Sequence, residues 1–445
     1  MAKTIDDYPV TSFVKRITLY SSGTAFLDGF NMIVASVALT LMGDDVSFSP
    51  TEIGLYASMY VLGVFLASFV GGKIGDNVGR TKIYKAAPLL VAAFSLALLA
   101  FHTPWILIAG RFAIGICIGA DYPMAGAIVS EFSPIAWRGK GLVILMFAWY
   151  VGALAGSLVG FAMYAMAGGW PWLLATTAVP AILFFLGRLA VPESSRWLAE
   201  KGRIAEAEAS LEKVFGNAAN IVDLSSVNEE GAAADSAPKT SLIQAFRQGY
   251  FKRFFFVAGF WICQCAPVTV VFMFGPTILQ QFGMGEGSMS VLGTALIYVF
   301  FMLGVLPAIK YIERMPRRAT VITTYVVMSV ALLGLGLVSN ASVVLILAFF
   351  ALYAIPYGLQ SVLDNIYPPE LFPTEIRSTA IGTLTSVSKL GGAVASFVFP
   401  IGLAAVGLGP CVIVGAVISI IGLVISVALA PETKGMTLEE SSSLQ

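Results

Sequence analysis

Five ionisable side chains lie inside long apolar stretches of this sequence, where a charge is costly: Asp28, Arg111, Asp121, Asp364 and Lys389. An ionised side chain at the centre of a lipid bilayer costs several kcal/mol, so each of the five is a candidate functional residue. Groups of this kind can carry protons or hold an oppositely charged substrate. The single histidine and the four cysteines, which all lie in apolar stretches, predict neither a metal site nor a disulfide framework.

Asp28 and Arg111 each need a partner in order to stay charged in an apolar environment. Asp121 follows Arg111 by ten residues, which is about 15 Å along a helix. We therefore do not expect Asp121 to be the first partner of Arg111. Two roles stay open for Asp121, namely a second proton carrier and a structural acid at an inner gate.

Lys389 lies in the middle of its apolar stretch, with Thr385 and Ser386 on the same face of the expected helix. A lone lysine in a cavity is a compact charge that suits a carboxylate, so Lys389 is the expected anchor for an anionic substrate. Two alternatives stay open, since Lys389 could pair with Asp364 or extend to a membrane interface. Its position in the middle of the stretch argues against the second.

One polar stripe runs along the expected tenth helix, at offsets of 0, 4, 7, 8 and 11 residues: Tyr353, Tyr357, Gln360, Ser361 and Asp364. Lipid would not tolerate such a stripe, so it should face a cavity. Asp364 lies close to the cytoplasmic end, where a gate and a substrate ligand are equally reasonable roles.

Polar and aromatic side chains on other expected helices complete the candidate substrate site. We add Asn31, Gln264 and Trp149 to the substrate-binding residues. Trp149, Tyr150, Trp261 and Tyr298 could stack on a ring, although most aromatic residues of so aromatic a chain must serve packing or interfacial belts.

The elements that position these residues are transmembrane helices. The 445 residues are 58% hydrophobic and 12% charged, with a net charge of zero and a mean hydropathy of +0.85. Soluble domains carry about 25% charged residues, which excludes a soluble enzyme, and there is no basic excess for nucleic acid. Twelve apolar stretches are long enough to cross a bilayer and do not alternate like barrel strands, so we predict an all-α membrane protein. They are residues 17–42, 53–73, 83–101, 105–130, 140–166, 171–190, 254–281, 288–310, 321–340, 343–367, 376–405 and 409–430.

The order of these stretches predicts two six-helix bundles, residues 1–190 and 253–445. A cytoplasmic linker at residues 191–252 joins them and carries an amphipathic helix over Ala199–Phe215. The loops on one side, with the two chain ends, hold 24 of the 26 basic residues, which leaves only Arg111 and Lys389 inside the bilayer. This asymmetry predicts cytoplasmic termini in the cell (inner) membrane, and no cleavable signal peptide is expected.

Six loop motifs echo one another between the two halves. Gly72-Lys-Ile-Gly-Asp-Asn-Val-Gly-Arg-Thr-Lys82 follows the second stretch, and a degraded copy, Lys310–Arg318, follows the eighth. The others are Glu131–Arg138, Pro192-Glu-Ser-Ser-Arg196, Pro369–Arg377 and Pro431-Glu-Thr-Lys-Gly435. In this order the motifs resemble the sugar-porter and organic-ion branches of the major facilitator superfamily. The resemblance implies twelve helices and alternating access around a midplane site. It also implies conformational latches at Asp76–Arg80, Glu131–Arg138 and Glu370–Arg377.

The same resemblance gives roles to individual residues. In sugar porters the residues that match Asp28 and Arg111 form a pair whose acid carries the coupled proton, and a static ion pair is the alternative. Gly119-Ala-Asp-Tyr-Pro123 resembles phosphate:proton symporters, although Asn31 replaces their second acid. The stretch around Lys389 resembles organic-anion transporters. Gln264-Cys-Ala-Pro267 lacks the paired glutamines with which sugar porters bind hydroxyls.

These features together favour import of a small organic anion, such as an aromatic or sugar-derived carboxylate, by proton symport. The alternatives are a proton-coupled or facilitative transporter of a neutral sugar or polyol, in which Asp364 neutralises Lys389, or of phosphate. A non-transporting sensor is less favoured because it needs no proton switch, and a membrane enzyme is least favoured. The expected partners are the substrate, protons and the lipid bilayer. We expect a monomer without a cofactor, a metal ion or nucleic acid.

Overall fold

The computed structural model describes residues 9–166, 169–216, 249–284, 287–311, 314–338, 342–364, 366–436 and 438–443. Within these ranges every regular element is a helix, and twelve helical segments are long and apolar enough to cross a membrane. They coincide with the twelve stretches expected from the sequence, so the prediction of an all-α membrane protein is confirmed. The expected sixth stretch is interrupted at Thr176 and Thr177, where α6 gives way to α7.

The first six spans are formed by seven helices: α1 (Ser12–Met42), α2 (Pro50–Val78), α3 (Arg80–Ala97), α4 (Pro104–Phe132), α5 (Ile135–Met163), α6 (Trp170–Ala175) and α7 (Ala178–Arg188). Local sequence sets their ends. Ser49 and Glu52 form a capping box that begins α2, with Pro50 at the first helical position. Gly79 separates α2 from α3 at a φ of 111°, which other residues rarely adopt.

The last six spans are α12 (Phe251–Gln281), α13 (Ser288–Tyr311), α14 (Arg317–Leu337), α15 (Val343–Leu363) with the short α16 (Tyr367–Glu370), α17 (Thr374–Val406) and α18 (Leu408–Leu429). The terminal α19 (Leu438–Ser442) follows them. Phe274 interrupts α12 with non-helical φ and ψ. The break lies in the turn before Pro276, whose ring and missing N–H disturb the preceding turn.

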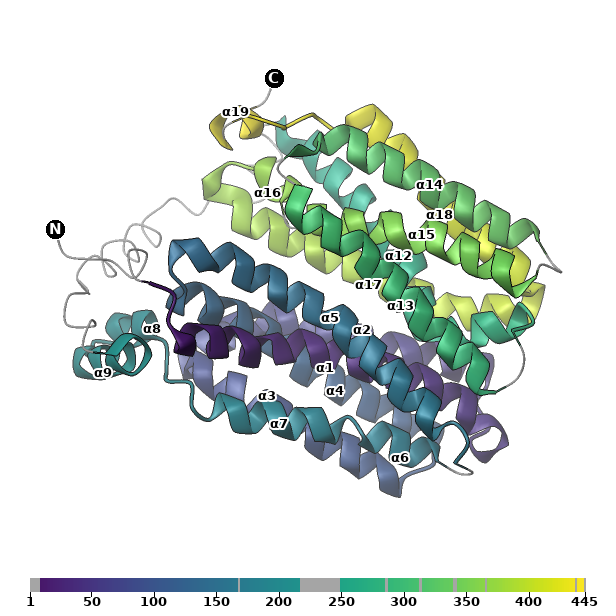
Figure 1. Cartoon of the computed structure of the whole chain (residues 1–445), viewed down its shortest axis with the longest axis horizontal. Helices are drawn as coiled ribbons and strands as arrows, with labels where there is room; N and C mark the ends of the chain where they lie inside the picture. The colour runs from purple at the N-terminus through teal and green to yellow at the C-terminus, as the bar shows by residue number, and fades with distance from the viewer. Residues whose placement is uncertain are drawn as a thin grey trace.

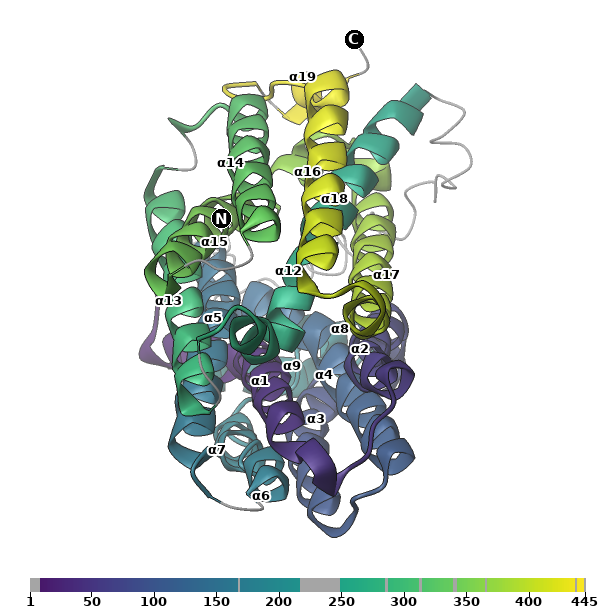
Figure 2. The ribbon, with the colours of Figure 1, turned by 90° about the vertical axis from the view of Figure 1, so that its right-hand side faces the viewer.

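The helices pack as two groups that also contact one another along several pairs of helices. Within the first group α1 packs on α4 and α5, and α2 packs on α4. Within the second, α12 packs on α17 and α18, and α13 packs on α15. The groups meet where α2 lies against α17, α5 against α13 and α1 against α12 (Figure 2). Their ribbons diverge toward the side that carries α8, α9 and α16, which we call the terminal face (Figure 1).

Two short helices follow the sixth span, where one amphipathic helix was expected. They are α8 (Ser195–Glu200) and α9 (Ile204–Phe215), and α9 buries Ala207, Leu211 and Val214 while its charged side chains stay exposed. Hydrogen bonds from Arg203 hold the pKa of the exposed Glu206 carboxyl below its ordinary value. Residues 217–248 of the expected linker lie outside the described residues, so the proposed domain boundaries remain a prediction.

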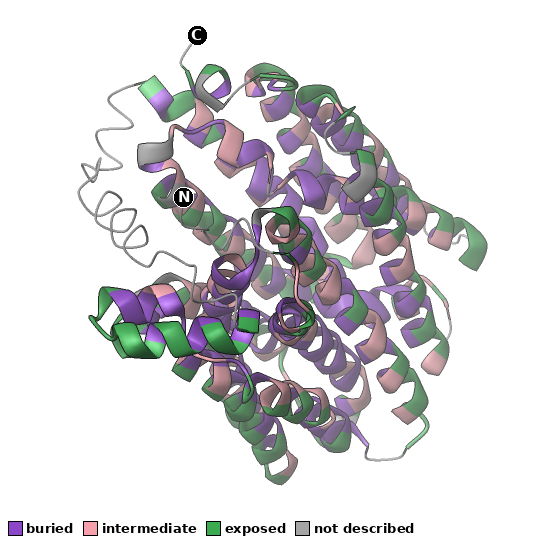
Figure 3. Ribbon diagram, turned by 60° about the vertical axis from the view of Figure 1, so that its left-hand side comes forward, coloured by how far each residue is buried: buried purple, intermediate pink, exposed green. Residues whose placement is uncertain are grey.

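Burial follows the two-group arrangement. Figure 3 shows buried faces toward the middle of the molecule and exposed faces along its periphery. Exposed apolar side chains such as Val344, Leu183 and Val424 lie on the spanning segments, where lipid rather than water is the expected neighbour. Asp28, Arg111 and Asp121 are buried among these helices, whereas Asp364 and Lys389 are partly exposed.

The close approach of α1 and α5 makes Gly29 a sensitive position. A Cβ atom added at Gly29 would overlap the backbone carbonyl of Trp149, and one at Gly152 would overlap that of Phe26. Because backbone cannot yield as a side chain can, we expect Gly29→Ala to lower the stability by about 1–3 kcal/mol, measured by thermal unfolding in detergent. Gly126→Ala is the control, because no atom lies within 4 Å of its added Cβ. Equal unfolding temperatures for the two variants would contradict the packing argument.

Candidate functional site

Asp28 lies in the middle of α1, with only 6% of its surface exposed, and is surrounded by neutral hydrogen-bond donors. The hydroxyl of Tyr60 donates to its Oδ1 at 2.5 Å, and the hydroxyl of Tyr122 donates to its Oδ2 at 2.6 Å. The indole Nε1 of Trp149 donates to the same Oδ2 at 3.1 Å. Three helices, α2, α4 and α5, thus supply donors that suit an ionised carboxylate.

Arg111 is fully buried in α4. It was expected to pair with Asp28, but it bonds to another residue. Its Nη1 donates to Oδ1 of Asn31 at 2.5 Å, and its guanidinium lies 4.1 Å from the ring centroid of Tyr60. The charges of Arg111 and Asp28 act on one another, but no ion pair within 4.0 Å joins these two described side chains. The expected direct pair is therefore wrong in this conformation, because the amide of Asn31, one turn along α1, takes the guanidinium. Asn31, expected at the substrate, also donates to Thr177 at 3.4 Å.

Asp121 pairs with an arginine that the sequence analysis placed outside the bilayer. Arg188 of α7 is fully buried, and its Nη1 lies 2.7 Å from Oδ2 of Asp121. The same guanidinium donates to the carbonyls of Tyr84 and Tyr20 and to the hydroxyl of Thr24. The expectation that only Arg111 and Lys389 are basic inside the membrane is thus wrong. The signal was available, since Arg188 falls within the expected sixth stretch and Asp121 needed a partner.

In the second group of helices, Asp364 follows directly after α15 and bonds to α12. Nε1 of Trp261 donates to Oδ1 of Asp364 at 3.1 Å. Lys389 of α17 is partly exposed, and its charge acts on Asp364, although no ion pair within 4.0 Å joins the two. The structure thus places Lys389 near Asp364, as the alternative in which Asp364 neutralises Lys389 requires.

Two buried glutamines beside Asp364 have unused hydrogen-bonding groups. Gln264 lies one turn after Trp261 on α12, and Gln360 lies one turn before Asp364 on α15. Both amide atoms of Gln360 and the Nε2 of Gln264 are buried without a hydrogen-bond partner among the described residues. Buried polar atoms normally have partners, so these amides have capacity for a ligand or water.

Aromatic side chains connect the two groups of helices near this level. We call Trp149 and Tyr150 of α5, Phe272 of α12, and Tyr298 and Phe301 of α13 the interbundle aromatic cluster. The ring centroids of Trp149 and Phe272 are 4.5 Å apart, and those of Tyr150 and Phe301 are 6.0 Å apart. Tyr150 also bonds to Ser361 at 3.2 Å. Tyr353 and Tyr357 of the α15 stripe both pack on Phe301.

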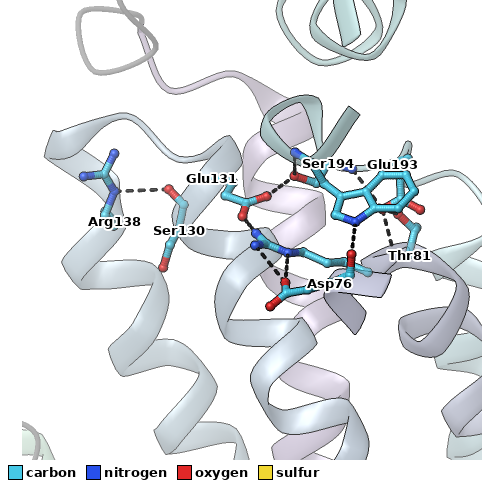
Figure 4. Close-up of polar contacts among 9 residues, drawn as sticks. Asp76, Thr81, Ser130, Glu131, Arg138, Glu193 and Ser194 are labelled. Carbon is cyan, nitrogen blue, oxygen red and sulfur yellow. Dashed lines mark hydrogen bonds and ion pairs between the residues drawn. The ribbon is translucent and has the colours of Figure 1, made fainter. Parts of the chain in front are cut away.

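At the terminal face, the first set of loop motifs converges on Glu131 (Figure 4). Glu131 contacts Arg80 and Ser194, while Arg80 also pairs with Asp76 at 3.2 Å. Arg138 instead donates to the carbonyl of Ser130 at 3.1 Å. The expected Glu131–Arg138 contact is therefore not formed in this conformation. Arg138 lies beyond the end of α4, where it reaches carbonyls that the helix leaves unpaired.

The second half repeats this arrangement. Glu370 pairs with Arg317 at 3.2 Å and accepts a hydrogen bond from Thr433 at 2.5 Å. Arg377 donates to the carbonyl of Phe372 at 3.0 Å, so the expected Glu370–Arg377 contact is not formed in this conformation either. In both halves the acid after the fourth or tenth span contacts the arginine that begins the third or ninth. The distant partner could not be identified from loop spacing alone.

Glu131 contacts Ser194, the residue that precedes α8, and so attaches α8 to the first bundle. We expect Glu131→Gln to loosen α8, because hydrogen bonds to a charged group contribute about 1.5–3 kcal/mol. Trypsin should then cleave faster at Lys201 and Arg203, between α8 and α9. Glu208→Gln, on the exposed face of α9, should leave the cleavage rate unchanged. An unchanged rate for Glu131→Gln would show that other contacts hold α8.

Comparisons with known proteins cover the whole chain. The family profile described as "Sugar (and other) transporter" matches residues 12–444. The chain is 36% identical to YaaU of Escherichia coli strain K12, over 100% of this chain and 98% of that protein. It is 32% identical to the inner membrane metabolite transport protein YgcS of the same organism, over 98% of this chain and 95% of that protein. The structure of the partially occluded inward open conformation of the xylose transporter XylE from E. coli matches with a TM-score of 0.80 at 19% identity, covering 96% of this chain and 100% of that chain.

Proposed function

The chain belongs to the sugar (and other) transporter family, within the major facilitator superfamily, and we propose that it carries a neutral sugar or polyol together with protons. It is a multi-pass membrane transporter of a small molecule and not an enzyme. The initial preference for an organic anion has less support than the alternative of a neutral sugar. We further propose that both termini are cytoplasmic, that the membrane is the inner membrane and that one chain is the working unit.

The observation that best supports a neutral substrate is the pair of buried amides of Gln264 and Gln360. Gln360 offers both a donor and an acceptor, and Gln264 offers a donor; none of these atoms makes a hydrogen bond within 3.5 Å to a described residue, although Gln264 lies beside Asp364 and Gln360 beside Tyr325. Neutral amides match hydroxyl groups, which both donate and accept. A hydroxyl-rich molecule between α12 and α15 would satisfy them, with Trp261, Tyr353 and Tyr357 nearby for contact with its apolar face.

The charge arrangement also fits a neutral substrate. Lys389 and Asp364 have opposite charges and lie in one neighbourhood, although no ion pair within 4.0 Å joins them, and this arrangement fits a site without a bound anion. In the first bundle, Asp28 and Arg111 provide one negative and one positive charge. We assign proton uptake and release to Asp28, whose two tyrosine donors, Tyr60 and Tyr122, can adapt to either protonation state. The terminal-face clusters around Glu131 and Glu370 would act as latches between conformations.

An organic anion remains a second candidate because of one observation. Lys389 is partly exposed and lies more than 4.0 Å from the oxygens of Asp364, so its ammonium is available to bind a carboxylate. Phosphate has less support, since Asn31 bonds to Arg111 where a second acid would be needed.

Uptake into proteoliposomes with an inward proton gradient separates these candidates. We expect sugars or polyols to be accumulated and carboxylates not. Gln360→Met should raise the KM about tenfold or more, because an unmet hydrogen bond costs about 1–3 kcal/mol. Lys389→Ala should still transport the neutral substrate. Gln281→Met, at the exposed end of α12, is the matched control. Carboxylate uptake that disappears in Lys389→Ala would establish the anion instead.

A further inference from the structure

We propose that Trp149 transmits the protonation of Asp28 to the contact between the two bundles. This inference rests on the proposed function, in which Asp28 carries the proton. Trp149 is the described side chain that hydrogen-bonds to Asp28 and also packs on the second bundle. Its Nε1 lies 3.1 Å from Oδ2 of Asp28, and its ring lies 4.5 Å from that of Phe272.

The hydrogen-bonding capacities of the three donors make Trp149 the one that must respond. Tyr122 and Trp149 both donate to Oδ2 of Asp28, while Tyr60 donates to Oδ1. A protonated carboxyl has its own O–H donor and loses one acceptor direction. A tyrosine hydroxyl can rotate and accept that proton, but an indole N–H can only donate. Protonation of Oδ2 therefore reverses the bond with Tyr122 and leaves Tyr60 donating to Oδ1, while the bond from Trp149 is weakened because its acceptor oxygen is no longer ionised.

The other face of Trp149 belongs to the interbundle aromatic cluster. Its ring centroid lies 5.3 Å from Tyr150 and 6.5 Å from Tyr298, and Phe272 lies 5.3 Å from Phe301. These rings come from α5, α12 and α13, and α5 against α13 is one of the contacts between bundles. A shift of the indole away from Asp28 thus changes the packing on which the relative position of the bundles depends.

Other titratable groups around Asp28 already have partners. They are Tyr60 on α2, Arg111, Asp121 and Tyr122 on α4, Tyr150 on α5 and Arg188 on α7. Arg111 is held by Asn31, and Asp121 is held by Arg188. Tyrosine and arginine change charge far above neutral pH. Of these groups, Asp28 is the one that accepts a hydrogen bond from the indole of Trp149, so its protonation is the one that Trp149 would detect.

A fluorescence titration without substrate tests the link directly. We expect the purified protein to show a pH-dependent change in tryptophan emission that disappears in both Trp149→Phe and Asp28→Asn. Trp172→Phe, which replaces a tryptophan with 61% of its surface exposed, should retain it. Unchanged unfolding temperatures would show that the variants are folded. A full pH-dependent signal in Trp149→Phe would overturn the proposal.

Transport measurements then separate transmission from substrate contact. Trp149 was expected among the substrate-binding residues, whereas its contacts are with Asp28 and Phe272. If it acts as the transmitting residue, Trp149→Phe, which keeps an aromatic ring but removes the N–H, should show counterflow with unchanged substrate affinity and a loss of uphill accumulation. Trp261→Phe, which removes the equivalent bond to Asp364, should raise the KM and leave the pH profile in place. If Trp149→Phe raises the KM and still accumulates substrate, Trp149 is a substrate contact and the proposal is wrong. If the unmodified protein shows no proton-driven uptake, the proposed function fails, while the fluorescence result still decides whether Trp149 responds to Asp28.

Discussion

Asp28→Asn is expected to abolish proton-driven accumulation while leaving counterflow of substrate intact. Asparagine has nearly the shape of aspartate but cannot bind or release a proton in the working pH range. Its amide resembles the protonated carboxyl, because one atom accepts and the other donates. Tyr60 can continue to donate, and Tyr122 can turn to accept. The variant should therefore fold and bind substrate as if Asp28 were permanently protonated.

Two assays on the same proteoliposomes separate coupling from transport. Accumulation against a concentration gradient should fall to equilibration, and counterflow should stay within a few-fold of the unmodified protein. Asp45→Asn is the matched control, since Asp45 accepts a hydrogen bond from Trp170 at 3.2 Å and lies outside the central region. It should accumulate substrate normally. Accumulation by Asp28→Asn at the normal level would show that Asp28 is structural.

The fold could be predicted from the sequence because each spanning segment can be recognised from its own length and composition. A stretch such as 409–430 needs no knowledge of its neighbours to be identified as a membrane helix, and α18 covers Leu408–Leu429. Local signals such as Ser49 and Glu52, or Gly79, likewise act over a few residues. These features depend on interactions between residues that are close in the chain, so they can be recognised in a single sequence.

The partners of the charged residues could not be predicted in the same way. Asp28, Arg111 and Asp121 were identified correctly as buried charges, but their contacts depend on how four helices are rotated against one another. Asn31 takes Arg111, and Arg188 takes Asp121, across separations of 80 and 67 residues. Loop spacing misled in a similar way at Glu131, whose partner Arg80 begins another helix. Residue type indicates that a partner is needed, and only packing determines which one.

The Asp121–Arg188 pair gives the largest expected effect on stability. The carboxylate of Asp121 accepts from Arg188 at 2.7 Å and from Thr24 at 2.6 Å, and both charged side chains are almost wholly buried. Asp121→Asn leaves the buried guanidinium of Arg188 without its counter-charge. Removal of one member of a buried ion pair costs about 3–5 kcal/mol, so we expect a large fall in unfolding temperature and in folded yield.

A double-substitution cycle shows whether the cost comes from the pair. Arg188→Gln should be similarly destabilising, and Asp121→Asn combined with Arg188→Gln should cost less than the sum, because no charge is left uncompensated. Arg203→Gln is the exposed control, since the Arg203–Glu206 pair lies at the surface, where an ion pair contributes little to stability. If Asp121→Asn is as stable as the unmodified protein but loses uphill accumulation, Asp121 is a second proton carrier. A destabilised variant that regains stability through the second substitution would instead identify Asp121 and Arg188 as the structural tie between α4 and α7.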